Sequence, residues 1–127
     1  MAATQTDPSA CQAVETGGTL SGGRIEDSRW CDGRQAYAGF NTVLPPNSPS
    51  CVQSSGGNIH DQDYVLSSAS SLHPGGVTVL FGDGSVEFIN NDIGSGNAAT
   101  AYPTSGGSPY GVWGALGSRN GSEAASR

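Results

Sequence analysis

The chain has 127 residues, of which 20 are Gly and 7 are Pro, and its hydrophobic fraction is 35%. The length allows one domain with a modest core, and the composition excludes long helices and favours a loop-rich fold. Lys is absent, and five Arg against eleven Asp and Glu give a net charge of -6, which excludes a basic surface for nucleic acid and favours a bound cation.

The sequence was also searched for a membrane-spanning segment and an export signal. It has no apolar run of about 18 residues, and the opening MAATQTDPSACQAV lacks the basic and then apolar regions of an export signal. The sequence as given therefore predicts neither a membrane span nor an export signal. Its Ser, Gly and Asn content without Lys is nevertheless typical of exported proteins, and a further N-terminal segment would reconcile the two observations.

The N-terminal third predicts short elements. Asp7 can cap a helix that has Pro8 at its first position, which predicts a short helix as far as Val14. Two candidate strands follow, at 25–30 and 36–44, and we expect them to pair across the Asp-Gly between them. Three prolines, Pro45, Pro46 and Pro49, then predict an extended segment that cannot join a central strand.

The clearest prediction is a β-hairpin over about 77–89. Its two apolar runs, 77–81 and 86–89, are separated by Gly-Asp-Gly-Ser, and Asp-Gly suits the tight turns of hairpins. A polar loop at 53–63 and a strand from Tyr64 toward His73 precede the hairpin, and a helical turn at 110–116 that packs on the sheet follows it. The predicted fold is α+β and mainly β, with one antiparallel sheet built on the hairpin in a single domain over 1–127.

Three cysteines, at positions 11, 31 and 51, allow one disulfide and one free thiol. Their spacing is too wide for a zinc knuckle. We favour the pair Cys11 and Cys51, because Cys31 lies between Trp30 and Asp32 in what reads as a strand-to-turn segment. Three reduced, partly buried thiols are the alternative.

Three blocks of sequence indicate a family. His73, nine further residues and then Asp83-Gly84 resemble the signature of a prepilin-associated domain of planctomycetes, and GFNTVLPPNSPSC at 39–51 and YGVWGALGSRNGSE at 110–123 resemble its other blocks. The resemblance implies a type II pseudopilin-like protein of the surface or secretion apparatus. It covers only that family's C-terminal part, without the long N-terminal pilin helix, and Cys31 replaces an expected small residue.

Calcium is the cation that the sequence suggests. It takes six to eight oxygen ligands, roughly, from carboxylates, Asn side chains and carbonyls on flexible loops. Two loops supply such groups, and the predicted ligands are Asp61, Asp63, Asn91 and Asp92, with Asn90 and Asn97 beside them. The resemblance adds that pseudopilins carry calcium in C-terminal loops. Acidic loops without metal are the alternative.

Catalysis is the second hypothesis. A metal-dependent hydrolase of an ester or lactone would use His60 or His73 as base, with Asp61, Asp63 or Asp83 holding the metal. The predicted hairpin argues against a direct pair of His73 with Asp83, since it would separate them by about 17 Å. A turn-forming Asp83 and a structural His73 are therefore the simpler roles.

The functional expectation is thus an exported pseudopilin-like module that binds calcium, located outside the cell or on its surface. Its expected partners are components of a pilus or secretion system, or a small ester or lactone if it is a hydrolase. A carbohydrate-binding surface is a third hypothesis, based on Trp30, Trp113, Tyr37 and Tyr110.

Overall fold

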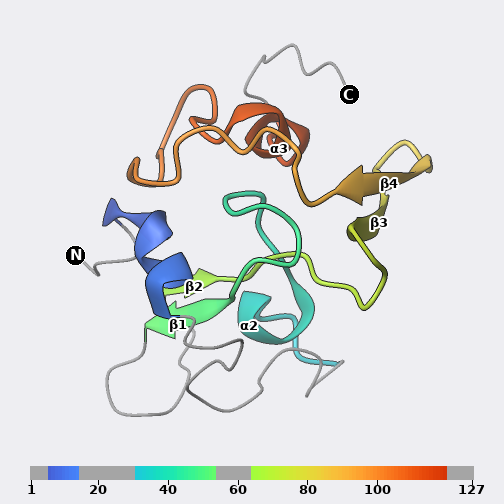
Figure 1. The fold of residues 1–127 in the computed structure, drawn as a ribbon, viewed down its shortest axis with the longest axis horizontal. Helices are drawn as coiled ribbons and strands as arrows, with labels where there is room; N and C mark the ends of the chain where they lie inside the picture. Colours follow the sequence, from blue (N-terminus) through green and yellow to red (C-terminus); the bar gives the residue numbers. More distant parts are fainter. Residues whose placement is uncertain (1–5, 15–30, 54–63, 120–127) are drawn as a thin grey trace.

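The structure is a computed structural model, and it describes residues 6–14, 31–53 and 64–119. The elements in chain order are η1 (Pro8–Val14), α2 (Gln35–Ala38), β1 (Cys51–Gln53), β2 (Tyr64–Leu66), β3 (Gly76–Leu80), β4 (Val86–Asn90) and α3 (Gly111–Leu116). Figure 1 shows η1 beside the β1–β2 pair, with α3 and the β3–β4 hairpin on the other side of the molecule. The predicted α+β, mainly β class is confirmed, with most of the described chain in loops.

In place of the expected single sheet, the described residues form two separate two-stranded antiparallel sheets. One pairs β1 with β2, and the other is the predicted hairpin, whose register joins Gly76 to Asn90 and Leu80 to Val86. The strand expected to run from Tyr64 toward His73 ends at Leu66, because the next backbone groups bond elsewhere: the Ser67 carbonyl accepts the Asn41 N–H, and the Ser68 N–H donates to the Ser50 hydroxyl. Just beyond β2, an isolated bridge pairs Asn41 with Ser68.

The strand predicted at 36–44 is wrong. The Asp32 carboxylate accepts hydrogen bonds from the backbone N–H and the guanidinium of Arg34, and a short helical turn, α2, follows at once. The turn buries Tyr37, and the chain then bends through Thr42 to Leu44. The other expected strand, 25–30, lies outside the described residues. Of the loop predicted at 53–63, Gln53 is the last residue of β1 and the rest lies outside the described residues.

The proline-rich segment also differs from the expectation. Ser48 N–H donates to the Pro45 carbonyl at 3.2 Å, and Asn47 has a φ of 60°. Pro46 before a residue of positive φ is the pattern of a type II turn. The segment therefore turns back toward the hairpin rather than running extended.

Three further predictions, the N-terminal helix, the disulfide and the C-terminal helical turn, are confirmed. Element η1 begins at Pro8 as a 3₁₀ helix, with the Asp7 carboxylate accepting the Ser9 N–H at 3.1 Å. The disulfide joins Cys11 to Cys51, and Cys31 is a free, exposed cysteine. At the other end, α3 packs Trp113 into the core.

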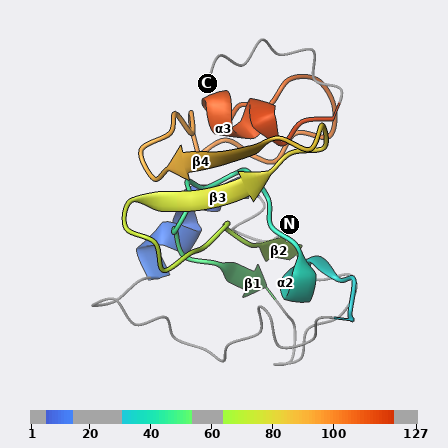
Figure 2. The same cartoon turned by 90° about the vertical axis from the view of Figure 1, so that its right-hand side faces the viewer.

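Two hydrophobic clusters form the core. The first surrounds the disulfide and contains Cys11, Val43, Leu44, Leu66 and Tyr110. The second lies under the hairpin and contains Ala69, Val77, Ile89 and Trp113. Figure 2 shows β4 between β3 and α3, which places an edge of the hairpin next to the helix. None of the described helices has the length and apolar character needed to cross a membrane.

Candidate functional site

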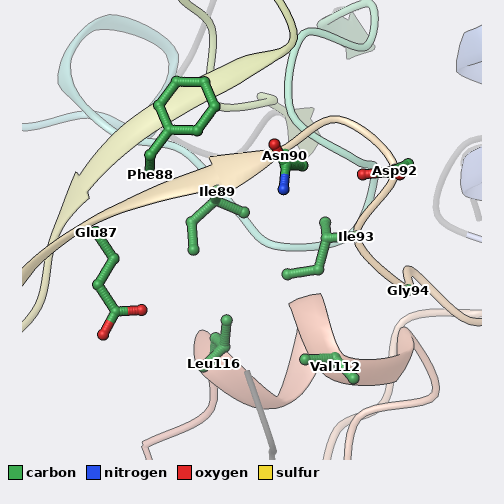
Figure 3. Close-up of a pocket in the computed structure, with 9 residues that line it drawn as sticks. All are labelled: Glu87, Phe88, Ile89, Asn90, Asp92, Ile93, Gly94, Val112 and Leu116. Carbon is green, nitrogen blue, oxygen red and sulfur yellow. The ribbon is translucent and has the colours of Figure 1, made fainter.

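A groove of about 410 Å³ lies between β4 and α3. Ile89 and Ile93 point into it from the strand side, and Val112 and Leu116 face them from α3, as Figure 3 shows. Its remaining lining residues are Glu87, Phe88, Asn90, Asp92 and Gly94. The groove thus has apolar walls with carboxylates at its borders.

Close backbone packing holds α3 in this position. Trp113 N–H donates to the Gly94 carbonyl at 3.0 Å, and a Cβ on Gly111 would lie 2.6 Å from the same oxygen. Gly111 also has a φ of 60°, which side-chain-bearing residues rarely adopt. The wall of the groove that α3 forms therefore depends on a glycine at 111.

The outer face of the hairpin is apolar. Leu80, Val86 and Phe88 are 71%, 62% and 49% exposed, and Leu80 lies directly opposite Val86 in the register. The Phe88 ring lies across Gly76, where a Cβ would meet it at 2.9 Å. The hairpin thus presents hydrophobic side chains to solvent beside the groove.

His73 and Asp83, the predicted catalytic pair, lie at opposite ends of the hairpin. His73 is exposed before β3, and its backbone N–H donates to the Ser71 hydroxyl at 3.0 Å. The Asp83 carboxylate accepts the backbone N–H and the hydroxyl of Ser85, at 2.9 and 2.7 Å, which is the bonding of a turn-forming Asp. The full length of the β3–β4 ladder separates them.

Of the predicted calcium ligands, Asn91 and Asp92 share the exposed turn that follows β4. The Asn91 side-chain oxygen accepts a 2.8 Å hydrogen bond from Asn47, and the Asn97 oxygen accepts the Ala99 N–H at 3.0 Å. Over residues 6–14, 31–53 and 64–119, no three His, Cys, Asp or Glu side chains gather as a metal site would require. His60, Asp61 and Asp63 lie outside the described residues.

Asn47 is a connecting residue that the sequence analysis missed. Its side-chain amide donates to Asn91, its side-chain oxygen accepts the Ser71 N–H at 2.8 Å, and its own N–H donates to the Ala69 carbonyl at 2.8 Å. It therefore ties the proline-rich turn to the base of the hairpin. An Asn directly after Pro-Pro was the available signal, since Asn tolerates positive φ in turns.

The aromatic residues proposed as a sugar-binding row are mostly part of the core. Tyr37, Tyr110 and Trp113 are 8%, 2% and 1% exposed. Trp30 lies outside the described residues. A flat exposed row is therefore not formed by these three side chains.

Of three comparisons with known proteins, one found a match. Searches of curated proteins and of solved structures found no significant match. A family profile described as "Protein of unknown function (DUF1559)" matches residues 1–96, about three quarters of the sequence. The chain therefore belongs to the DUF1559 family of proteins of unknown function.

Proposed function

We propose that the chain is an exported, pilin-like module of the cell surface or of a secretion apparatus. The observation that carries the proposal is the Cys11–Cys51 disulfide, which lies in the core with Cys11 fully buried. Disulfides persist in oxidising compartments and are rare in the cytosol. Membership of DUF1559, a family associated with planctomycete pilin-like proteins, supports the same location.

The resemblance to the prepilin-associated domain adds the pilin-like part of the proposal. Its signature residues, His73 and Asp83-Gly84, bracket β3 and form the entry and the turn of the hairpin. Their observed hydrogen bonds suit structural roles, with Asp83 closing the turn. The signature residues therefore suit a structural role at the entry and the turn of the hairpin better than a catalytic role.

The test of the location is fractionation of the source cells with an antibody against the chain, combined with protease treatment of intact cells. The proposal predicts that the protein is found outside the cytoplasm and that external protease digests it. A protein recovered only in the cytosolic fraction, and resistant until the cells are lysed, would contradict it.

Calcium binding is a second candidate, which the shared position of Asn91 and Asp92 on one exposed turn favours. In this proposal Asp61 and Asp63 supply the further carboxylates that a hard cation needs. Calcium should then raise the midpoint of thermal unfolding after EDTA treatment, by mass action. Asp92→Asn should reduce that rise and Glu87→Gln should leave it unchanged; equal rises in both variants would contradict the site.

The ester or lactone hydrolase gains no support from the geometry. It would combine His73 or His60 with a metal-holding Asp, and the hairpin keeps His73 and Asp83 at its two ends.

A further inference from the structure

The alternation of hydrogen-bonded and non-bonded residue pairs in the hairpin shows which backbone groups point away from it. Asn91 N–H donates to the Gly75 carbonyl and Phe81 N–H to the Ser85 carbonyl, both at 2.9 Å. Bonded and non-bonded pairs alternate in an antiparallel ladder. Val79 therefore exchanges bonds with Glu87, while the N–H and C=O of Val86 and Phe88 point to the outer edge of β4.

Among the described residues, this outer edge is open. In the part of the chain that the structure describes, no backbone partner is present for Val86 or Phe88. At the end of β4 the Asn90 carbonyl accepts the Ile93 N–H at 3.2 Å, so the chain itself closes the edge there. Exposed edge groups of this kind are a template for pairing with another strand.

The groove runs along the same edge. Its apolar walls, Ile93, Val112 and Leu116, face the space beside β4. A strand placed next to β4 would bond to Val86 and Phe88 and direct alternate side chains toward those walls. Its other side chains would extend the apolar face formed by Leu80, Val86 and Phe88.

The exposed carboxylate of Asp92 and the direction of β4 indicate what charge the bound segment should carry and at which end. Asp92 lies just beyond the C-terminal end of β4 and is exposed. An antiparallel strand would begin near Asp92, so a basic residue or a free amino group at its N-terminal end would be attracted there. A second copy of this chain fits less well, because each copy carries a net charge of -6.

We propose that this groove binds an extended, apolar segment of a partner polypeptide with a basic N-terminal end, which adds to the hairpin as a third strand, antiparallel to β4. Backbone hydrogen bonds supply affinity, and the groove selects alternate apolar side chains. The inference rests on the hairpin and α3 alone and does not depend on the exported location.

The test begins with a displayed library of random peptides of strand length, selected on the full chain. A selected peptide is then synthesised with a fluorescent label, and its affinity is measured for the chain and for two proline variants. Val86→Pro removes an N–H from the outer edge of β4 without removing a bond to β3. Thr78→Pro is the matched control, because Thr78 lies opposite Phe88 in a non-bonded pair and its N–H faces the other edge of the hairpin.

The proposal predicts selected peptides with alternating apolar residues and a basic N-terminal end. Val86→Pro should weaken binding about tenfold, which is the effect of roughly one lost backbone hydrogen bond, while Thr78→Pro should leave it within about twofold. Asp92→Asn should weaken it about two- to fivefold. Far-ultraviolet circular dichroism checks that both proline variants fold.

A second measurement tests the proposal without the Val86→Pro variant, in case that variant fails to fold. N-methylation of alternate backbone amides of the peptide removes its edge-directed N–H groups, and should weaken binding to the unmodified chain about tenfold if pairing occurs. Selection of no peptide, equal loss in both proline variants, or insensitivity to N-methylation would overturn the proposal. So would a dimer of the chain that Val86→Pro dissociates, since the occupant would then be a second copy.

Discussion

The indole Nε1 of Trp113 donates a 2.8 Å hydrogen bond to the backbone carbonyl of Leu44, and both residues are buried. This bond joins α3 to the segment between α2 and β1. The Phe40 ring covers the indole from outside, with the ring centroids 6.3 Å apart and the planes nearly parallel at 7°. Trp113 therefore links the wall of the groove to the rest of the core.

Trp113→Phe should lower the free energy of unfolding by about 2 to 4 kcal/mol. It leaves the Leu44 carbonyl buried without its donor and opens a cavity under the hairpin. Denaturant unfolding measures the loss. Phe40→Leu is the control, because Phe40 is 48% exposed and stacks on the indole without taking part in the buried hydrogen bond, and it should cost about 1 kcal/mol. Equal losses in the two variants would show that the buried hydrogen bond contributes little.

Substitutions at Asn47 should separate its side-chain bonds from its backbone conformation. Asn47→Gly keeps the positive φ and loses the side-chain bonds to Ser71 and Asn91. Asn47→Ala loses the bonds and also strains the backbone, so it should be less stable than the Gly variant by about 1 kcal/mol. Thermal unfolding of both variants checks this order. An Ala variant as stable as the Gly variant would contradict the turn geometry at 45–48.

Stability should fall as pH rises from about 10 to 12 because of Tyr64. Burial, with smaller contributions from Tyr110 and Tyr102, raises the pKa of Tyr64 from 10.0 to about 12. Between these values the folded chain retains a proton that the unfolded chain has lost, so ionisation favours unfolding as pH rises. Burial also raises the pKa of Tyr110 and acts in the same direction.

Tyr64→Phe should therefore reduce this alkaline loss of stability, which unfolding midpoints at a series of pH values would measure. The Tyr64 hydroxyl is buried and has no hydrogen-bond partner among the residues that the structure describes, so its removal should leave stability at pH 7 unchanged or slightly raised. Tyr102→Phe is the matched control on the exposed member of the cluster. The same alkaline loss in Tyr64→Phe and the unmodified chain would exclude this role for Tyr64.

Removal of the disulfide by Cys11→Ser and Cys51→Ser together should cost about 3 to 4 kcal/mol. The two cysteines are 40 residues apart, and a loop of that length loses much conformational entropy when it is closed in the unfolded chain. Cys31→Ser, at an exposed free cysteine, should leave the free energy of unfolding within about 0.5 kcal/mol. Urea unfolding without reductant compares the three proteins, and a Cys31→Ser loss as large as that of the double variant would be incompatible with this pairing.

The parts of the fold that the sequence predicts correctly are those with local signals. Asp83-Gly84 between two apolar runs predicts the hairpin, and Asp7-Pro8 predicts the start of η1, because in each case neighbouring residues determine the backbone. The pattern of residues 36–44 wrongly predicts a strand, because the structure of this segment depends on distant partners. Tyr37 is buried by the tertiary fold. The Gly39 carbonyl accepts a hydrogen bond from the side-chain hydroxyl of Ser67, which lies 28 residues away in the sequence.

The groove illustrates the same limit. Its walls come from β4 and α3, which are more than twenty residues apart in sequence, and the spacing of Ile93 and Leu116 carries no signal that they face each other. The sequence correctly predicts that Asn91 and Asp92 lie on one loop after the hairpin. The hydrogen-bond partner of Asn91, Asn47, could not be predicted, because it reaches Asn91 from a turn far along the chain.

The thiol state of the protein isolated from its source cells tests the central claim most directly. The cells are lysed in an alkylating reagent without reductant, and the mass of each cysteine-containing peptide is measured. An exported, disulfide-linked module predicts that Cys31 alone is alkylated and that the Cys11 and Cys51 peptides are joined. Alkylation of all three cysteines would contradict both the pairing in the native protein and the proposed location.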